Sequence, residues 1–77
     1  MREEILELLK RMKGDADFEH SEDFIADGLI DSFEIVDLVA EMEERFSIEI
    51  SGRDIIPENF VNLEAMDTMI QKYTEGM

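Results

Sequence analysis

The stretch GLIDSFEIVDLVAEMEERF, residues 28–46, carries the strongest helix signal of this chain. Apolar residues recur in it at the spacing of one helix face. The pattern predicts an amphipathic helix over residues 32–46 whose apolar stripe faces a core. The stripe consists of Ile35, Leu38, Val39, Met42 and Phe46.

The start of this helix contains two signals that select the same register. With Asp31 as N-cap, Glu34 falls at N3 and completes a variant of the capping box. Ile30 and Ile35 then occupy the two positions of a hydrophobic staple. Ser32 becomes the first helical residue, and its hydroxyl has no capping duty. An anion attached there would be stabilised by a few tenths to about 1 kcal/mol at the positive end of the helix dipole.

A second apolar strip, formed by Phe33, Val36 and Ala40, lies off the core stripe. Close acids on one helix repel each other and destabilise the helix by a few tenths of a kcal/mol per pair. A helix that combines this repulsion with an exposed apolar strip is typical of a surface that binds a partner. The alternative is that Phe33 folds back against Leu29 or the preceding loop. The acids beside the strip are Asp37, Glu41, Glu43 and Glu44.

The remaining elements predict a single all-α domain over residues 1–77, a small helical bundle. A first helix is expected over 3–13, stopped by Gly14, and a last helix runs from an Asn62 cap to about Tyr73. The connection 14–31 contains enough apolar residues to pack over the core. Polar and apolar residues alternate over 47–50, which predicts an extended segment. Residues 51–60 are expected to form a loop with one helical turn. The inward-facing residues predicted outside 32–46 are Ile5, Leu8, Leu9, Met12, Phe18, Phe24, Ile25, Leu29, Ile30, Leu63, Met66, Ile70 and Tyr73.

The charge of the chain restricts its partners. Its 77 residues include 21 acids and seven bases, for a formal net charge of −14, and four of the seven bases lie before Gly14. Such a surface repels nucleic acid and anionic membranes and favours partners with basic patches. The alternative is that the acidic residues serve only to keep the protein in solution. A hydrophobic content of 44% and the clear periodicity argue against disorder. Without cysteine, the chain can form no disulfide and no thiolate metal site. No apolar signal segment or membrane-length apolar run is present, so a cytoplasmic protein is expected. We also expect a discrete, monomeric protein without a metal site.

At these residues the chain resembles an acyl carrier protein, or more broadly a phosphopantetheine-binding carrier domain. The similarity covers nearly the whole chain. It depends on the Asp31-Ser32-Phe33 triplet combined with DFIADGLIDSFEIVDLVAEMEERFSIEI, residues 23–50, and the capped final segment NLEAMDTMIQKY, residues 62–73. The triplet alone is weak, whereas the triplet with these flanking helices is a specific signal.

The resemblance implies a four-helix bundle with three main helices and one short helix, which we place near residues 53–57. It implies that a phosphopantetheinyl transferase attaches 4′-phosphopantetheine from coenzyme A to Ser32, next to Asp31. The terminal thiol would carry an acyl or aminoacyl group as a thioester to loading ligases or transferases and downstream enzymes, in fatty acid, polyketide or related biosynthesis. The chain itself would not be an enzyme. The residues expected to meet those partners are Phe33, Val36, Asp37, Ala40, Glu41, Glu43 and Glu44.

Two departures leave the cargo open. Fatty-acid carriers commonly have Asp-Ser-Leu after a small residue, whereas here Leu29-Ile30 precede Asp-Ser-Phe. The sequence Leu-Ile-Asp-Ser, residues 29–32, is more similar to that of D-alanyl carriers and of some stand-alone carriers of specialised pathways. The segment SGRDIIPENFVN, residues 51–62, also looks longer than its fatty-acid counterpart. A D-alanyl or aminoacyl carrier for cell-envelope modification or peptide synthesis therefore remains an alternative.

Three other functional classes are alternatives to a carrier. A hydrolase would need a base for Ser32, and the only histidine, His20, lies in a loop with no orienting pattern. An EF-hand begun at Asp15 fails because His20 and Ala26 occupy the glycine and glutamate positions. An unmodified acidic helical adaptor shares the fold and charge but needs no serine chemistry.

The methionines suggest where a cargo could lie. We predict partial shelter between the second and last helices against Met42, Met66 and Met69, because unbranched thioethers adapt to varied shapes. The alternative is that these methionines are ordinary core residues.

Overall fold

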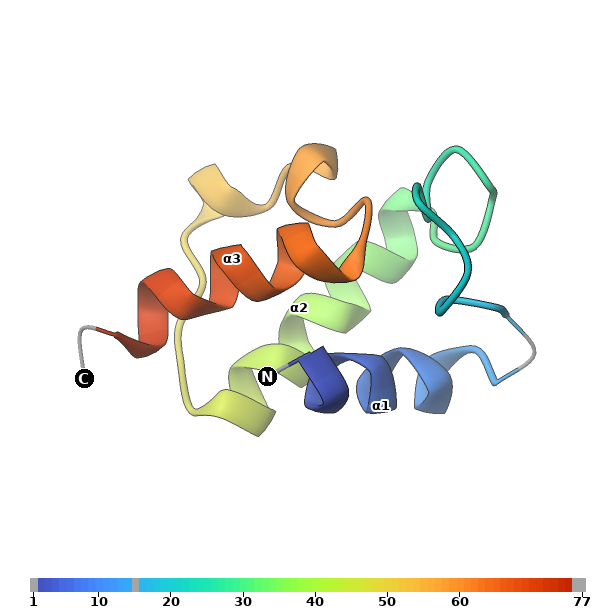
Figure 1. The fold of residues 1–77 in the computed structure, drawn as a ribbon. Coiled ribbons are helices and arrows are strands. Elements are labelled where there is room, and N and C mark those ends of the chain that lie inside the picture. The colour runs from blue at the N-terminus through green and yellow to red at the C-terminus, as the bar shows by residue number, and fades with distance from the viewer. Residues whose placement is uncertain (1, 15, 76–77) are drawn as a thin grey trace.

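The computed structural model describes residues 2–14 and 16–75. Three α-helices are present in this part of the chain: α1 (Arg2–Met12), α2 (Ser32–Phe46) and α3 (Leu63–Thr74). Two short 3-10 helices, η1 (Gly52–Asp54) and η2 (Pro57–Asn59), lie between α2 and α3 (Figure 1). No strand occurs in the described residues, so the predicted all-α class is confirmed.

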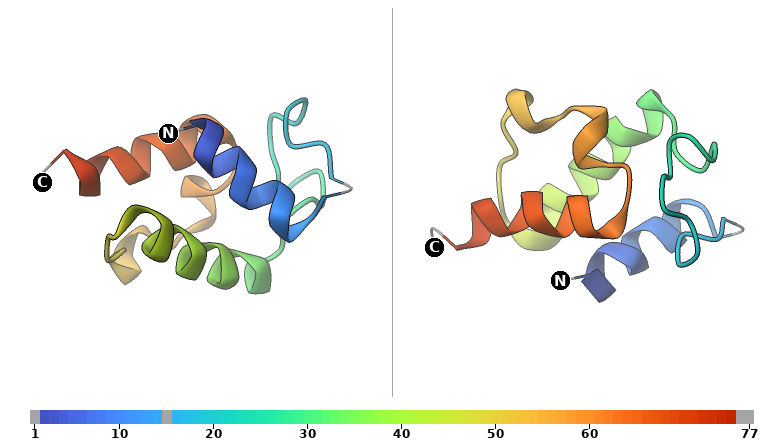
Figure 2. Two further views of the ribbon diagram at one scale, coloured as in Figure 1. Left: turned by 90° about the horizontal axis from the view of Figure 1, so that it is seen from below. Right: turned by 45° about the horizontal axis from the view of Figure 1, so that its top comes forward.

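The helices surround one core, and α1 packs against both α2 and α3 (Figures 1 and 2). Ion pairs join opposite ends of α1 and α2. Lys13, just after α1, pairs with Glu34 at the start of α2 (3.1 Å), and Arg45 near the end of α2 reaches Glu7 on α1 (3.6 Å). The two helices therefore run antiparallel.

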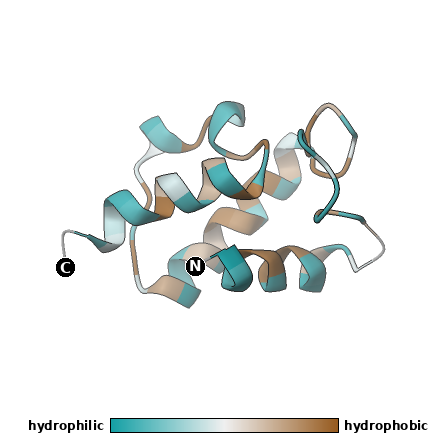
Figure 3. Ribbon diagram, in the orientation of Figure 1, coloured by the Kyte–Doolittle hydropathy of each residue, from teal (hydrophilic) through white to brown (hydrophobic). Residues whose placement is uncertain are grey.

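The helical periodicity predicts most of the core within the helices, whereas the burial of Ile50, Phe60 and Met69 was not predicted by it. Each helix carries both hydrophobic and hydrophilic positions along its length (Figure 3). The radius of gyration is 11.4 Å, which matches the value of about 11.5 Å expected for a compact chain of this length. The buried residues are Ile5, Leu8, Leu9, Phe18, Phe24, Ile30, Ile35, Leu38, Val39, Met42, Ile50, Phe60, Met66, Met69 and Ile70.

The long connection before α2 packs onto the core, as predicted. Phe18 and Phe24 are buried, and their rings meet edge to face with centroids 5.1 Å apart. The Phe24 N–H donates to the Val61 carbonyl (2.6 Å), which ties the connection to the segment before α3. Gly28 has a φ of +74°, a conformation that a residue with a Cβ adopts only under strain.

The short fourth helix predicted near residues 53–57 does not form as one helix. Two 3-10 turns take its place, and Ile55 and Ile56 separate them. Ile56 precedes Pro57 and is extended, with φ −127° and ψ 151°. The proline ring disfavours the helical conformation in the residue before it, which explains why the two turns do not join into one helix across Ile56.

The other predicted boundaries hold to within one or two residues, with two refinements. Asn62 caps α3 as expected, its side chain accepting from the Ala65 N–H (2.7 Å), and α3 extends to Thr74. Ser47, predicted as extended, instead ends α2 in the left-handed conformation (φ 54°). Six of the predicted inward-facing residues are only half-buried: Met12, Ile25, Leu29, Phe46, Leu63 and Tyr73.

Candidate functional site: the start of α2

The predicted capping box at the start of α2 is confirmed. The Glu34 N–H donates to Asp31 Oδ1 (2.9 Å), and the Asp31 N–H donates to Glu34 Oε1 (3.0 Å). Ile30 and Ile35, the two staple residues, are both buried. These contacts fix the register in which Ser32 is the first residue of α2.

The Ser32 side chain is exposed, and among the described residues no hydrogen bond involves its hydroxyl. Asp31 supplies the cap that a serine often supplies at a helix start, so Ser32 is not needed for capping. Its hydroxyl is therefore free to react or to bind a partner at the positive end of the α2 dipole.

Glu34 has a second role that the sequence alone did not reveal. Its Oε1 closes the capping box, while its Oε2 pairs with Lys13 Nζ (3.1 Å). Lys13 is distant in sequence, so no local pattern could have indicated this contact. As a result, a cation from the end of α1 is held beside the start of α2, where Asp31 and Glu34 otherwise concentrate negative charge.

The apolar strip next to Ser32 faces outward. Phe33 is 84% exposed and Val36 is 63% exposed, and Ala40 is exposed as well. The alternative in which Phe33 folds back onto Leu29 or the loop is therefore wrong. Two large apolar side chains left in water one turn apart form a surface that a partner can cover.

The acids that flank the strip fall into two groups. Asp37, Glu41 and Glu44 are exposed, and no ion pair engages them among residues 2–14 and 16–75. Glu43 is half-buried, and its contacts lie within the fold. Its Oε2 accepts a hydrogen bond from the Ile50 N–H (2.9 Å), and its backbone carbonyl accepts from the N–H groups of Ser47 and Ile48. Glu43 thus stabilises the end of α2, a contact seven residues away that the helix pattern did not predict.

The scarce bases of the chain are largely used within the fold. Their charges are balanced by neighbouring acids, and none of them forms an ion pair with Asp37, Glu41 or Glu44 in the described residues. Five bases form ion pairs: Arg2 with Asp67, Lys10 with Glu19, Lys13 with Glu34, Arg45 with Glu4 and Glu7, and Lys72 with Asp54.

His20 does not form a catalytic pair with Ser32 in the described structure. Its ring Nδ1 lies 2.8 Å from Asp17 Oδ2, within the loop, and both side chains are largely exposed. The hydrogen bond to Asp17, followed by the attraction of its charge, raises the pKa of His20 above its ordinary value. This exposed pair offers no support for the hydrolase alternative.

Within residues 2–14 and 16–75, no group of three or more histidine, cysteine, aspartate or glutamate side chains is arranged to hold a metal ion. Asp15, the first position of the EF-hand alternative, lies outside the described residues. None of the described helices is long and apolar enough to cross a membrane.

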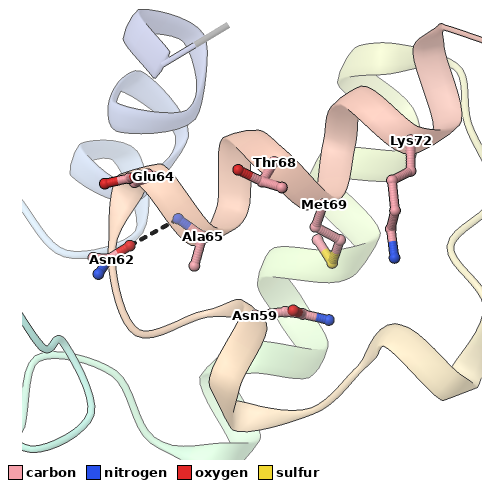
Figure 4. Close-up of a pocket in the computed structure, with 7 residues that line it drawn as sticks. All are labelled: Asn59, Asn62, Glu64, Ala65, Thr68, Met69 and Lys72. Carbon is pink, nitrogen blue, oxygen red and sulfur yellow. Dashed lines mark hydrogen bonds between the residues drawn. The ribbon is translucent and has the colours of Figure 1, made fainter.

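The methionines proposed to shelter a cargo are packed in the core. Met42, Met66 and Met69 are at most 1% exposed. Met69 also lines a groove of about 370 Å³ between η2 and α3, together with polar residues (Figure 4). This burial is what ordinary core residues show, and shelter of a cargo stays a prediction.

Comparison with known proteins gave no relative: no protein-family model, no curated protein and no solved structure matches this chain. The functional argument therefore depends on the site itself.

Proposed function

We propose that this chain is a carrier protein that holds an acyl or aminoacyl group as a thioester on a 4′-phosphopantetheine arm attached to Ser32. One observation carries the proposal: a complete capping box assigns the cap to Asp31 and leaves the Ser32 hydroxyl exposed at the positive end of an acidic helix. This arrangement supports modification of Ser32 because a substituent there disturbs no contact of the fold.

The residues around Ser32 fit a phosphodiester. Backbone N–H groups at the first turn of α2 favour an anion, and Lys13 offsets part of the negative charge of Asp31 and Glu34. When bound, the prosthetic group supplies the thiol that carries the cargo, in a chain that has no cysteine of its own. Ser32 holds the group, and the capping box keeps the Ser32 backbone in place.

The exposed face of α2 supports docking to the enzymes that load and use the cargo. Phe33 and Val36 offer an apolar contact immediately after the attachment residue, and Asp37, Glu41 and Glu44 offer negative charge around it. Partner enzymes with an apolar pocket ringed by basic residues fit this face, because opposite potentials speed encounter and fix orientation. A D-alanyl or other aminoacyl cargo agrees with the same face.

The test is the intact mass after incubation with coenzyme A and a promiscuous phosphopantetheinyl transferase. We expect a gain of one phosphopantetheine in the unaltered chain and in Ser47→Ala, and none in Ser32→Ala. Ser47 is a matched control, because it is an exposed serine at the opposite, negative end of the same helix.

The acidic adaptor is the second candidate, and the exposed Phe33 favours it equally. No mass gain from protein with intact helical circular dichroism would overturn the carrier proposal and favour the adaptor. For an adaptor, Ser32→Ala would leave partner binding unchanged while Phe33→Ser would weaken it.

A further inference from the structure

The segment between α2 and α3, residues 51–59, is held to the rest of the molecule largely by polar contacts. It lies between two buried residues, Ile50 and Phe60, but neither of its 3-10 turns contains a buried residue. Ile55 is half-buried and Ile56 is 38% exposed. Apolar burial inside this segment, called the strap from here on, is therefore small.

Polar contacts to the end of α3 compensate for this small burial. The Tyr73 hydroxyl donates to Asp54 Oδ2 and accepts the Ser51 N–H (3.0 Å), while Lys72 Nζ pairs with Asp54 Oδ1 (3.0 Å). Within the strap, the Asn59 side chain donates to the Asp54 carbonyl (2.8 Å). Asp54 thus connects both turns of the strap to α3.

The ionisation states suit these contacts at neutral pH. The Tyr73 hydrogen bond, and then that of Lys72, hold the pKa of Asp54 below its ordinary value, so its carboxylate accepts two hydrogen bonds. Burial, and then the bond to Asp54, raise the pKa of Tyr73, so its hydroxyl stays protonated and can donate.

The strap and α3 together line the groove that contains Met69. Asn59 on the strap side and Met69, Thr68 and Lys72 on α3 all line it (Figure 4). Met69 is only 1% exposed. Lys72 and Asn59, which line the groove, are also bonded to Asp54.

We propose that the strap opens as a unit, hinged at Ile50 and Phe60, and that the contacts of Asp54 with Tyr73 and Lys72 keep it closed against α3, with Asn59 beside the groove that Met69 lines. Segments with few buried apolar contacts open locally at a lower free energy than the whole domain unfolds. Here the closed state depends on one carboxylate and its partners together with the partial packing of Ile55 on the core. This inference concerns the fold alone and is independent of whether Ser32 is modified.

Amide hydrogen exchange measures the opening directly. The reporter amides are those of Asp54, Ile55, Asn59 and Phe60, each of which donates to a carbonyl inside the strap region. In Tyr73→Phe we expect their protection to fall about ten-fold, as for loss of a hydrogen bond to a charged group, while amides in the centre of α1 keep theirs. Glu58→Gln removes an exposed carboxylate of the same segment and should change neither set.

Thiol labelling gives a second readout, because the chain has no cysteine. Met69→Cys places a thiol at a buried position of the groove that Asn59 of the strap also lines, and Leu9→Cys places one at a position of α1 that is 0% exposed. Adding Tyr73→Phe or Asp54→Asn should speed labelling at position 69 about ten-fold and leave position 9 unchanged.

Two results would overturn the proposal. Equal acceleration at positions 69 and 9 would mean that the substitutions only lower global stability. Unchanged exchange and labelling in both Tyr73→Phe and Asp54→Asn would mean that these contacts do not keep the strap closed.

Discussion

Two phenylalanines of this chain are predicted to differ widely in their effect on stability. Phe24 lies in the connection before α2 and is 0% exposed, whereas Phe33 lies in a helix and is 84% exposed. We compare the same substitutions at both positions, to leucine and to alanine. Because the side chain is identical, any difference reports its environment.

The expected magnitudes follow from burial. Phe24→Ala deletes a buried ring that meets the Phe18 ring edge to face, so a loss of about 3–5 kcal/mol is expected. At about 0.05–0.15 kcal/mol per residue, the whole domain is stable by about 4–12 kcal/mol, so this loss removes at least about a quarter of the stability and, at the lower end of the range, nearly all of it. Phe24→Leu should cost about 1–2 kcal/mol and remain folded. Both substitutions of Phe33 should stay within about 0.5 kcal/mol.

Urea unfolding followed by far-ultraviolet circular dichroism measures these free energies, and thermal midpoints provide a check. For a domain of this size, 1 kcal/mol corresponds to about 4–8 °C in Tm. The reasoning fails if Phe33→Leu and Phe24→Leu lower the free energy of unfolding equally. That result would place Phe33 in the core and remove the exposed strip from the proposed docking face.

Two further predictions concern the end of α2 and the loop. Ser47→Gly should raise the free energy of unfolding by about 0.5–1 kcal/mol, because glycine adopts the left-handed conformation (φ 54°) without the Cβ clash; Ser51→Gly, at φ −65°, is the control, and an equal gain there would contradict the explanation. His20 should titrate above its ordinary pKa of 6.5 in proton NMR, because its pairing with Asp17 favours the protonated ring. Since this folded pKa is raised, the contact contributes stability below pH 6.5 and loses it as pH rises through the folded value. Asp17→Asn should return the pKa of His20 toward 6.5, and an unchanged titration would show that the pair does not form in solution.

The sequence by itself determined the three helices and the start of α2. These features arise from near neighbours: the periodic apolar stripe, the Asp31–Glu34 capping box and the Asn62 cap each involve residues at most a few turns apart. The same register fixed Ser32 as the first residue of α2, so the candidate site was accessible to prediction.

Only the tertiary structure decided which side chains near that site are free. Glu43 and Asp37 look alike in the sequence, yet Glu43 accepts the Ile50 N–H while Asp37 faces water. The Lys13–Glu34 pair and the Asp54–Tyr73 contact join residues 21 and 19 positions apart, a separation at which no periodicity or capping rule applies. Such contacts form only after the helices pack, because packing supplies the proximity that the local chain does not.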